Sequence, residues 1–196
     1  SKVIEKLGWL LSEPDPLALA LPLQNTFTMK GVEYGFIPNW TKLTVGEFAD
    51  LETYSSKGLF DNLEKALAVL YRPIEKKKID SYRIEPYSPH QKKQDKMLDC
   101  TMDIVVGAVV FFLSYREEIS NRFAPLFSST KEKEVNKIHN KWGWYGIMYE
   151  LAGGDVTKME TVTLIYIEEA LTFMAYERDI RINQNVNLNA NSSRHK

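Results

Sequence analysis

The feature that most limits the fold of this chain is an uninterrupted apolar run, IVVGAVVFFL, between Ile104 and Leu113. A helix of this length rises about 15 Å, which is half of what a helix needs to cross the hydrocarbon core of a membrane. Asp103 precedes the run and Arg116 follows it closely. We therefore expect residues 104–113 to form a helix in the core of a globular protein, and we predict no membrane span.

The composition agrees with an ordinary globular protein. The chain has 196 residues, of which 44% are hydrophobic and 26% are charged. Lys and Arg number 25 against 26 Asp and Glu, so bulk charge gives no attraction to nucleic acid or to an anionic membrane. The N-terminal residues lack the anatomy of a signal peptide. A single cysteine excludes an intrachain disulfide and a cysteine-based zinc site, and a cytoplasmic location is expected.

The segment before the apolar run predicts one hairpin and two helices. Alternating apolar residues around Gly31 predict a β-hairpin over about 26–37. Thr44 to Glu47 has the spacing of a capping box and predicts a helix start. Leucines at helical spacing predict a second helix over 59–71, which Arg72-Pro73 should end. For 74–89 the pattern fits either an ordered loop or a short β-ribbon.

The segment after the run predicts further helices over about 132–151 and 156–181. Gly153-Gly154-Asp155 between them is a stop followed by a cap. We therefore predict a mainly α (α+β) fold: a single, compact, mostly helical domain over 1–182 with the small N-terminal hairpin. Asparagines alternate with apolar residues in 183–196, so this part is expected to be an extended or disordered C-terminal arm.

Sequence patterns for catalysis or cofactor binding are lacking. No phosphate-binding glycine loop is present, and no two of His90, His139 and His195 have the spacing of a metal-binding pair. Asp99 and Asp103 share a helix face, but such pairs are usually solvated. Cys100 is more typical of a small buried hydrophobe than of a nucleophile. We expect a non-enzymatic protein without cofactor or metal.

Two surfaces are candidates for binding a macromolecule. Trp142, Tyr145 and Tyr149 share one helix face while Trp144 points elsewhere; they either pack in the core, which is the commoner role, or form a protein interface. The helix that follows is apolar over a wide arc, so its second face must be central or covered by another chain. If the C-terminal arm binds a neighbouring subunit, Val186 and Leu188 would set the register of its strand there. Lysines 76–78 beside tyrosines leave nucleic-acid binding as a weaker alternative.

Several segments, taken in order, resemble tail-assembly chaperones of tailed bacteriophages and related small virion-assembly proteins. They are WTKLTVGEFADLE at 40–52, LAVLYRP at 67–73, VVFFL at 109–113, GDVTK at 154–158 and YIEEAL at 166–171. The resemblance covers roughly 40–180 and implies a helical protein that coats the tape-measure protein while the tail tube assembles. It carries over no site residues.

From this resemblance we expect a non-enzymatic phage assembly protein in the cytoplasm of an infected bacterium. Its partners would be other phage structural proteins, the tape-measure protein among them, or further copies of itself. The alternative is a permanent structural component of the virion in the tail, connector or capsid. A nucleic-acid-binding accessory protein is the second alternative.

Overall fold

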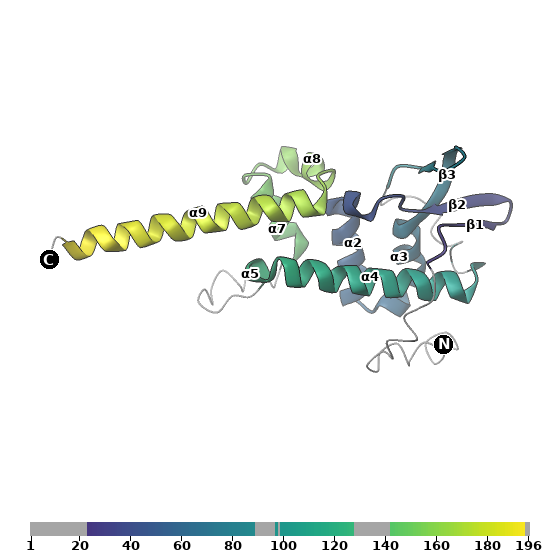
Figure 1. The fold of residues 1–196 in the computed structure, drawn as a ribbon, viewed down its shortest axis with the longest axis horizontal. Helices are drawn as coiled ribbons and strands as arrows, with labels where there is room; N and C mark the ends of the chain where they lie inside the picture. The colour runs from purple at the N-terminus through teal and green to yellow at the C-terminus, as the bar shows by residue number, and fades with distance from the viewer. Residues whose placement is uncertain (1–22, 89–96, 98, 128–141, 195–196) are drawn as a thin grey trace. The chain divides into compact units, whose positions relative to one another are not determined.

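The computed structural model describes residues 23–88, 97, 99–127 and 142–194, with side chains up to Gln184 (Figure 1). The chain divides into two compact units. Unit 1 comprises Ser1–Trp40 and Glu47–Arg116, and unit 2 comprises Thr41–Gly46 and Glu117–Lys196. That residues 1–182 form a single domain stays a prediction.

Unit 1 contains an antiparallel sheet of four strands in the order β1-β2-β3-β4. The strands are β1 (Thr26–Met29), β2 (Val32–Phe36), β3 (Tyr71–Lys77) and β4 (Tyr82–Ile84). Lys30 and Gly31 have φ of 50° and 78° in the β1–β2 turn, the backbone conformation that a tight two-residue hairpin requires. The predicted hairpin is therefore confirmed, and of the two alternatives for 74–89 the structure shows the ribbon.

A glycine in β2 allows an aromatic ring to cover the sheet. A Cβ atom at Gly35 would lie 2.5 Å from the Tyr82 ring, so only glycine leaves room for it. The Tyr82 hydroxyl donates to the carbonyl oxygen of Phe36 at 2.8 Å. This contact ties β4 to β2 across β3.

The helices that contribute to unit 1 supply most of its core. They are α2 (Val45–Ser56), the 3₁₀ turn η4 (Leu59–Asn62), α3 (Leu63–Leu70) and α4 (Met102–Arg122). In α4 the apolar run is mostly buried, as predicted: Ile104, Val105, Val106, Ala108, Val109 and Phe112. The Phe111 ring meets the Phe36 ring edge-on at 4.8 Å, so α4 packs against the sheet through aromatic contacts.

Unit 2 is helical in its described part. It contains α5 (Ala124–Phe127), α7 (Trp144–Leu151), the turn η6 (Val156–Lys158), α8 (Met159–Thr163) and α9 (Ile167–Arg194), preceded in the chain by the turn η3 (Trp40–Lys42). The start of α9 is held by the backbone of 43–45: Ile167 N donates to Leu43 O, and Val45 N donates to Ile165 O, each at 2.8 Å. Arg122 of α4 pairs with Glu168 of α9 at 2.7 Å.

The predicted class, mainly α with a small sheet, is confirmed, and two details of the sequence interpretation need correction. The helix over 59–71 begins as η4 and ends at Leu70, and Arg72-Pro73 lies within β3 rather than only ending the helix. The extended arm over 183–196 is wrong for 183–194, which continue α9 as helix. Each residue added to an existing helix gains a backbone hydrogen bond, whereas a lone strand has no neighbour to bond. The part of the predicted helix 132–151 before Trp142 lies outside the described residues.

Candidate protein-interaction surface

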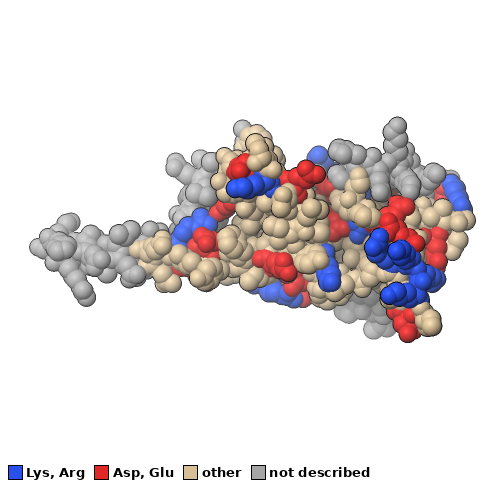
Figure 2. Space-filling view, turned by 90° about the horizontal axis from the view of Figure 1, so that it is seen from above, with Lys and Arg blue, Asp and Glu red and all other residues tan. Residues whose placement is uncertain are grey.

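Large apolar side chains that are exposed lie mostly in unit 2. Its exposed members within the described residues are Phe127, Trp142, Tyr145, Tyr149, Val156, Leu164, Phe173, Tyr176 and Ile182. Figure 2 shows uncharged side chains over much of the face that carries α8 and the first turns of α9. Contiguous exposed apolar surface on a folded protein is typical of an interaction site.

Helix α9 has one face that packs inside unit 2. Ile167, Ala170 and Leu171 are exposed by 2% or less, and Met174 is half-buried. These residues recur at intervals of three and four, the spacing of one face of an α-helix. From Thr172 to Gln184 no further side chain is buried. The inner face therefore anchors only the first turns of the helix.

A second apolar stripe runs along the other side of α9. Phe173 and Tyr176 are 53% and 64% exposed, and Ile180 is half-buried. At about 100° per residue, the three lie on one line directed away from Ile167 and Leu171. We call Phe173, Tyr176 and Ile180 the outer stripe. The wide apolar arc predicted for this helix contains Phe173 and Tyr176, and Ile180 continues their spacing.

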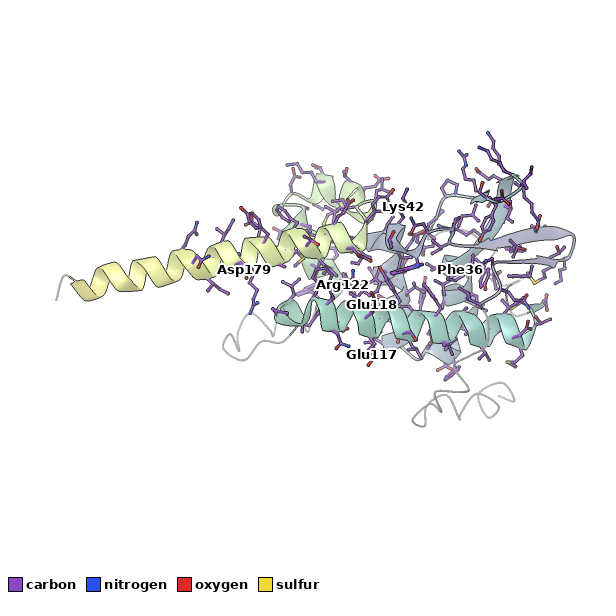
Figure 3. The ribbon with its side chains drawn as sticks, viewed as in Figure 1. Phe36, Lys42, Glu117, Glu118, Arg122 and Asp179 are labelled. Atoms are coloured by element: carbon purple, nitrogen blue, oxygen red, sulfur yellow. The ribbon has the colours of Figure 1, made fainter. Side chains whose placement is uncertain are left out.

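The three charged side chains of α9 that lie nearest the outer stripe are acidic. Glu169, Glu177 and Asp179 lie within about a quarter turn of it, and Figure 3 labels Asp179 on α9. None of the three forms an ion pair within the described residues. Arg178 lies on the opposite side of the helix, and Arg181 donates to Glu150 of α7 at 2.8 Å. The outer face of α9 is therefore apolar at its centre and negative at its edges.

The aromatic run at the start of α7 is also exposed. Trp142, Tyr145 and Tyr149 are 53%, 50% and 48% exposed, and the rings of Trp142 and Tyr145 lie 5.9 Å apart. Trp144 is half-buried and points elsewhere, as the helical spacing predicts. Core packing, the commoner role, is wrong for Trp142, Tyr145 and Tyr149, because each of these side chains is about half exposed. Tyr145 and Tyr149 of α7, together with Trp142 just before it, form an exposed aromatic surface.

The turn between α7 and α8 has the predicted stop and cap. Gly153 and Gly154 have φ of 65° and 79°, and a Cβ atom at Gly154 would approach the Tyr149 hydroxyl to 3.3 Å. The Asp155 carboxylate accepts from Thr157 N at 3.0 Å and caps the 3₁₀ turn η6. Hydrogen bonds from Thr157 lower the pKa of Asp155. These glycines thus hold Tyr149 at the end of α7.

A cluster of ionisable side chains lies in unit 1. The Arg72 guanidinium donates to the Glu47 carboxylate at 2.6 Å, and both side chains are buried. The Tyr87 ring lies 5.8 Å from the Arg72 guanidinium carbon, and its hydroxyl donates to Asp50 at 2.5 Å. Burial, followed by the bond to Asp50, raises the pKa of Tyr87. Each of these charged groups has a protein partner, so the cluster fastens β3 to α2.

The residues considered for catalysis give no reactive centre in the described part of the chain. Burial raises the pKa of the Cys100 thiol to about 11, so the thiol stays protonated at neutral pH. His90, His139 and His195 lie outside the described residues. Among those that are described, no group of three or more His, Cys, Asp or Glu could hold a metal ion. No helix in the same part is long and apolar enough to cross a membrane.

The basic residues at 76–78 lie at the end of the β3–β4 hairpin. Figure 2 shows Lys and Arg side chains there beside acidic ones. Lys77 pairs with Glu33, and Arg83 pairs with Glu75 at 2.6 Å. Lys77 and Arg83 thus have acidic partners within the described residues, and nucleic-acid binding by this hairpin stays a prediction.

The last two predicted contact residues, Val186 and Leu188, fall in the helical part of α9, and their side chains lie outside those the structure describes.

Comparison with family models, curated proteins and solved structures finds no match to this chain. The resemblance to phage assembly proteins therefore stays a prediction. The site is defined by its own geometry: the outer stripe of α9 and the aromatic surface of α7.

Proposed function

We propose that this chain is a non-enzymatic assembly protein that binds another protein through the apolar helical faces of unit 2. The observation that carries the proposal is the second apolar face of α9. Phe173 and Tyr176 are more than half exposed although the opposite face of the same helix is packed. Aromatic side chains supply large contact area and are enriched among the residues that dominate binding energy.

Within this class, we propose a role like that of a phage tail-assembly chaperone, which holds a tail or tape-measure protein in the cytoplasm of an infected bacterium. The order of the similar sequence segments supports the assignment to phage assembly. An aromatic surface divided between α7 and α9 also suits a client that must be held and then released. Such a surface offers several moderate contacts in place of one deep pocket.

The alternative is a permanent structural component of the virion. The length of α9 favours it: the helix has 28 residues, about 42 Å, and none of its described side chains after Leu171 is buried. A helix so weakly anchored gains stability when a neighbouring protein covers it. Purified particles analysed by mass spectrometry distinguish the two roles, because a chaperone leaves the particle and a component stays.

The proposal is tested by affinity purification of the tagged full-length chain from infected cells. The double variant Phe173→Ala/Tyr176→Ala should lose the co-purifying structural protein, since it removes the two most exposed rings of α9. The matched control is Val156→Ala, which alters a side chain that is 66% exposed on a different element of unit 2. Both variants should melt within a few degrees of the unchanged chain. A double variant that retains the partner in full would contradict the proposal.

A further inference from the structure

We infer that the outer stripe of α9 binds a basic amphipathic helix of the partner protein. The inference rests on the proposed function and adds the chemistry of the partner. An apolar stripe edged by charges of one sign selects a partner that has apolar residues at its centre and the opposite charge at its edges. The sign of the flanking charges on α9 is the decisive observation.

That sign is negative along the described length of the stripe. Glu169 and Asp179 are exposed and Glu177 is half-buried. The basic residue of α9 that lies nearest the stripe, Arg181, pairs with Glu150 at 2.8 Å. Lysine is absent from α9 altogether. A Lys-rich or Arg-rich segment would therefore meet three carboxylates that have no ion pair within the described residues, while its apolar side chains cover Phe173 and Tyr176.

The shape of the stripe favours a helix as the bound element. Phe173, Tyr176 and Ile180 follow each other at intervals of three and four along a straight α-helix, so they form a ridge about 10 Å long. Ridges of this kind pack into the grooves between side chains of another helix. Long Lys and Arg side chains on the partner can lie along the apolar ridge and reach the flanking carboxylates.

A second copy of this chain is the other occupant to consider, and charge argues against it. If two outer stripes faced each other, Glu169, Glu177 and Asp179 of one copy would lie beside the same residues of the other. Like charges placed side by side at an interface disfavour the complex. The stripe is therefore better suited to a different, basic protein than to itself.

Two synthetic peptides test the inference on the full-length chain. Both form amphipathic helices of about five turns with the same leucine pattern; one carries Lys at every polar position and the other carries Glu. Dissociation constants are measured by fluorescence anisotropy of labelled peptide at low and at high salt. The Lys peptide should bind at least ~10-fold more tightly than the Glu peptide, and salt should weaken its binding.

Charge variants of the chain locate the site. Neutralising the stripe with Glu169→Gln, Glu177→Gln and Asp179→Asn should weaken binding of the Lys peptide by about tenfold, as expected for a few exposed ion pairs. The matched control has the same net charge as the stripe variant and neutralises three exposed carboxylates that lie away from the stripe: Asp80→Asn, Glu117→Gln and Glu160→Gln. It should bind the Lys peptide like the unchanged chain. Phe173→Ala should weaken binding of the Lys peptide as well.

The inference is overturned if neither peptide binds, if both bind equally, or if the stripe variant and the control behave alike. It is also overturned if the chain alone forms a dimer in sedimentation experiments that Phe173→Ala abolishes, because the occupant is then a second copy. If both peptides bind equally and Phe173→Ala weakens both, the charge selection is wrong but protein binding by the stripe stands. The proposed function fails only if the double variant Phe173→Ala/Tyr176→Ala still co-purifies with the partner protein in full.

Discussion

The buried ion pair in unit 1 allows a sharp test of how the sheet is attached to α2. Arg72 and Glu47 are 7% and 4% exposed, and their charged groups meet at 2.6 Å. Arg72→Met removes the guanidinium but keeps an unbranched side chain of similar length. The Glu47 carboxylate therefore stays buried but loses the positive charge that pairs with it. Loss of one partner of a buried pair costs about 3–5 kcal/mol, and loss of the contact with the Tyr87 ring adds about 1 kcal/mol.

A cost of this size is a large share of the stability of a domain, which is about 5–15 kcal/mol. The double variant Arg72→Met/Glu47→Leu should recover most of it, because a buried pair replaced by apolar residues of similar size is often neutral. The coupling energy between the two sites should therefore be about 3 kcal/mol or more.

Urea denaturation of the full chain, followed by far-ultraviolet circular dichroism, measures these free energies of unfolding. The matched control is Arg83→Met in the same sheet, where the guanidinium is 2.6 Å from Glu75 but its side chain is 68% exposed. This change should cost no more than about 1 kcal/mol. The reasoning is refuted if Arg72→Met costs no more than Arg83→Met, or if the double variant is as unstable as the single one.

Three further predictions concern the core, the thiol and the end of α9. Phe112→Ala should lower the free energy of unfolding by about 3–5 kcal/mol and Phe111→Ala by less, because Phe112 is 1% exposed and Phe111 half-buried; equal losses below ~1 kcal/mol for both would contradict this. Burial raises the pKa of Cys100 from 9.0 to about 11, so the folded chain keeps a proton that the unfolded chain loses. Stability should fall as pH rises through that interval, and Cys100→Ala should remove part of the fall, which unfolding curves at several pH values measure. Deletion of residues 183–196 should leave the melting temperature nearly unchanged and weaken partner binding; equal binding by the shortened chain would show that this end takes no part.

Features that depend only on residues close together in the chain could be predicted from the sequence. Gly31 between alternating apolar residues was enough to predict the β1–β2 hairpin, because turn geometry is a local property of the backbone. The run 104–113 predicted a buried helix because ten apolar residues in succession are longer than most buried strands and too short to cross a membrane. Gly153 and Gly154 followed by Asp155 predicted the turn after α7 for the same local reason.

The wide apolar arc in the sequence of α9 predicted only that two faces of the helix must pack against other residues or another protein. Which face is packed depends on Leu43, Ile165 and the helices of unit 2, which are distant in sequence. The same holds for Trp142 and Tyr145, whose spacing suits a core and an exposed surface equally well. Periodicity states which residues share a side of a helix, whereas burial depends on what lies against that side.

The tertiary structure alone decided the strand pairing of β3 and the Arg72–Glu47 bond. The helical course of 183–194 has a local cause, although the period-two pattern of the asparagines favoured a strand. A strand needs a neighbour for its backbone hydrogen bonds, and a helix that already exists supplies them from within the same chain segment. The sequence by itself therefore determined the local turns and the apolar faces, and long-range packing determined which of those faces remains open to a partner.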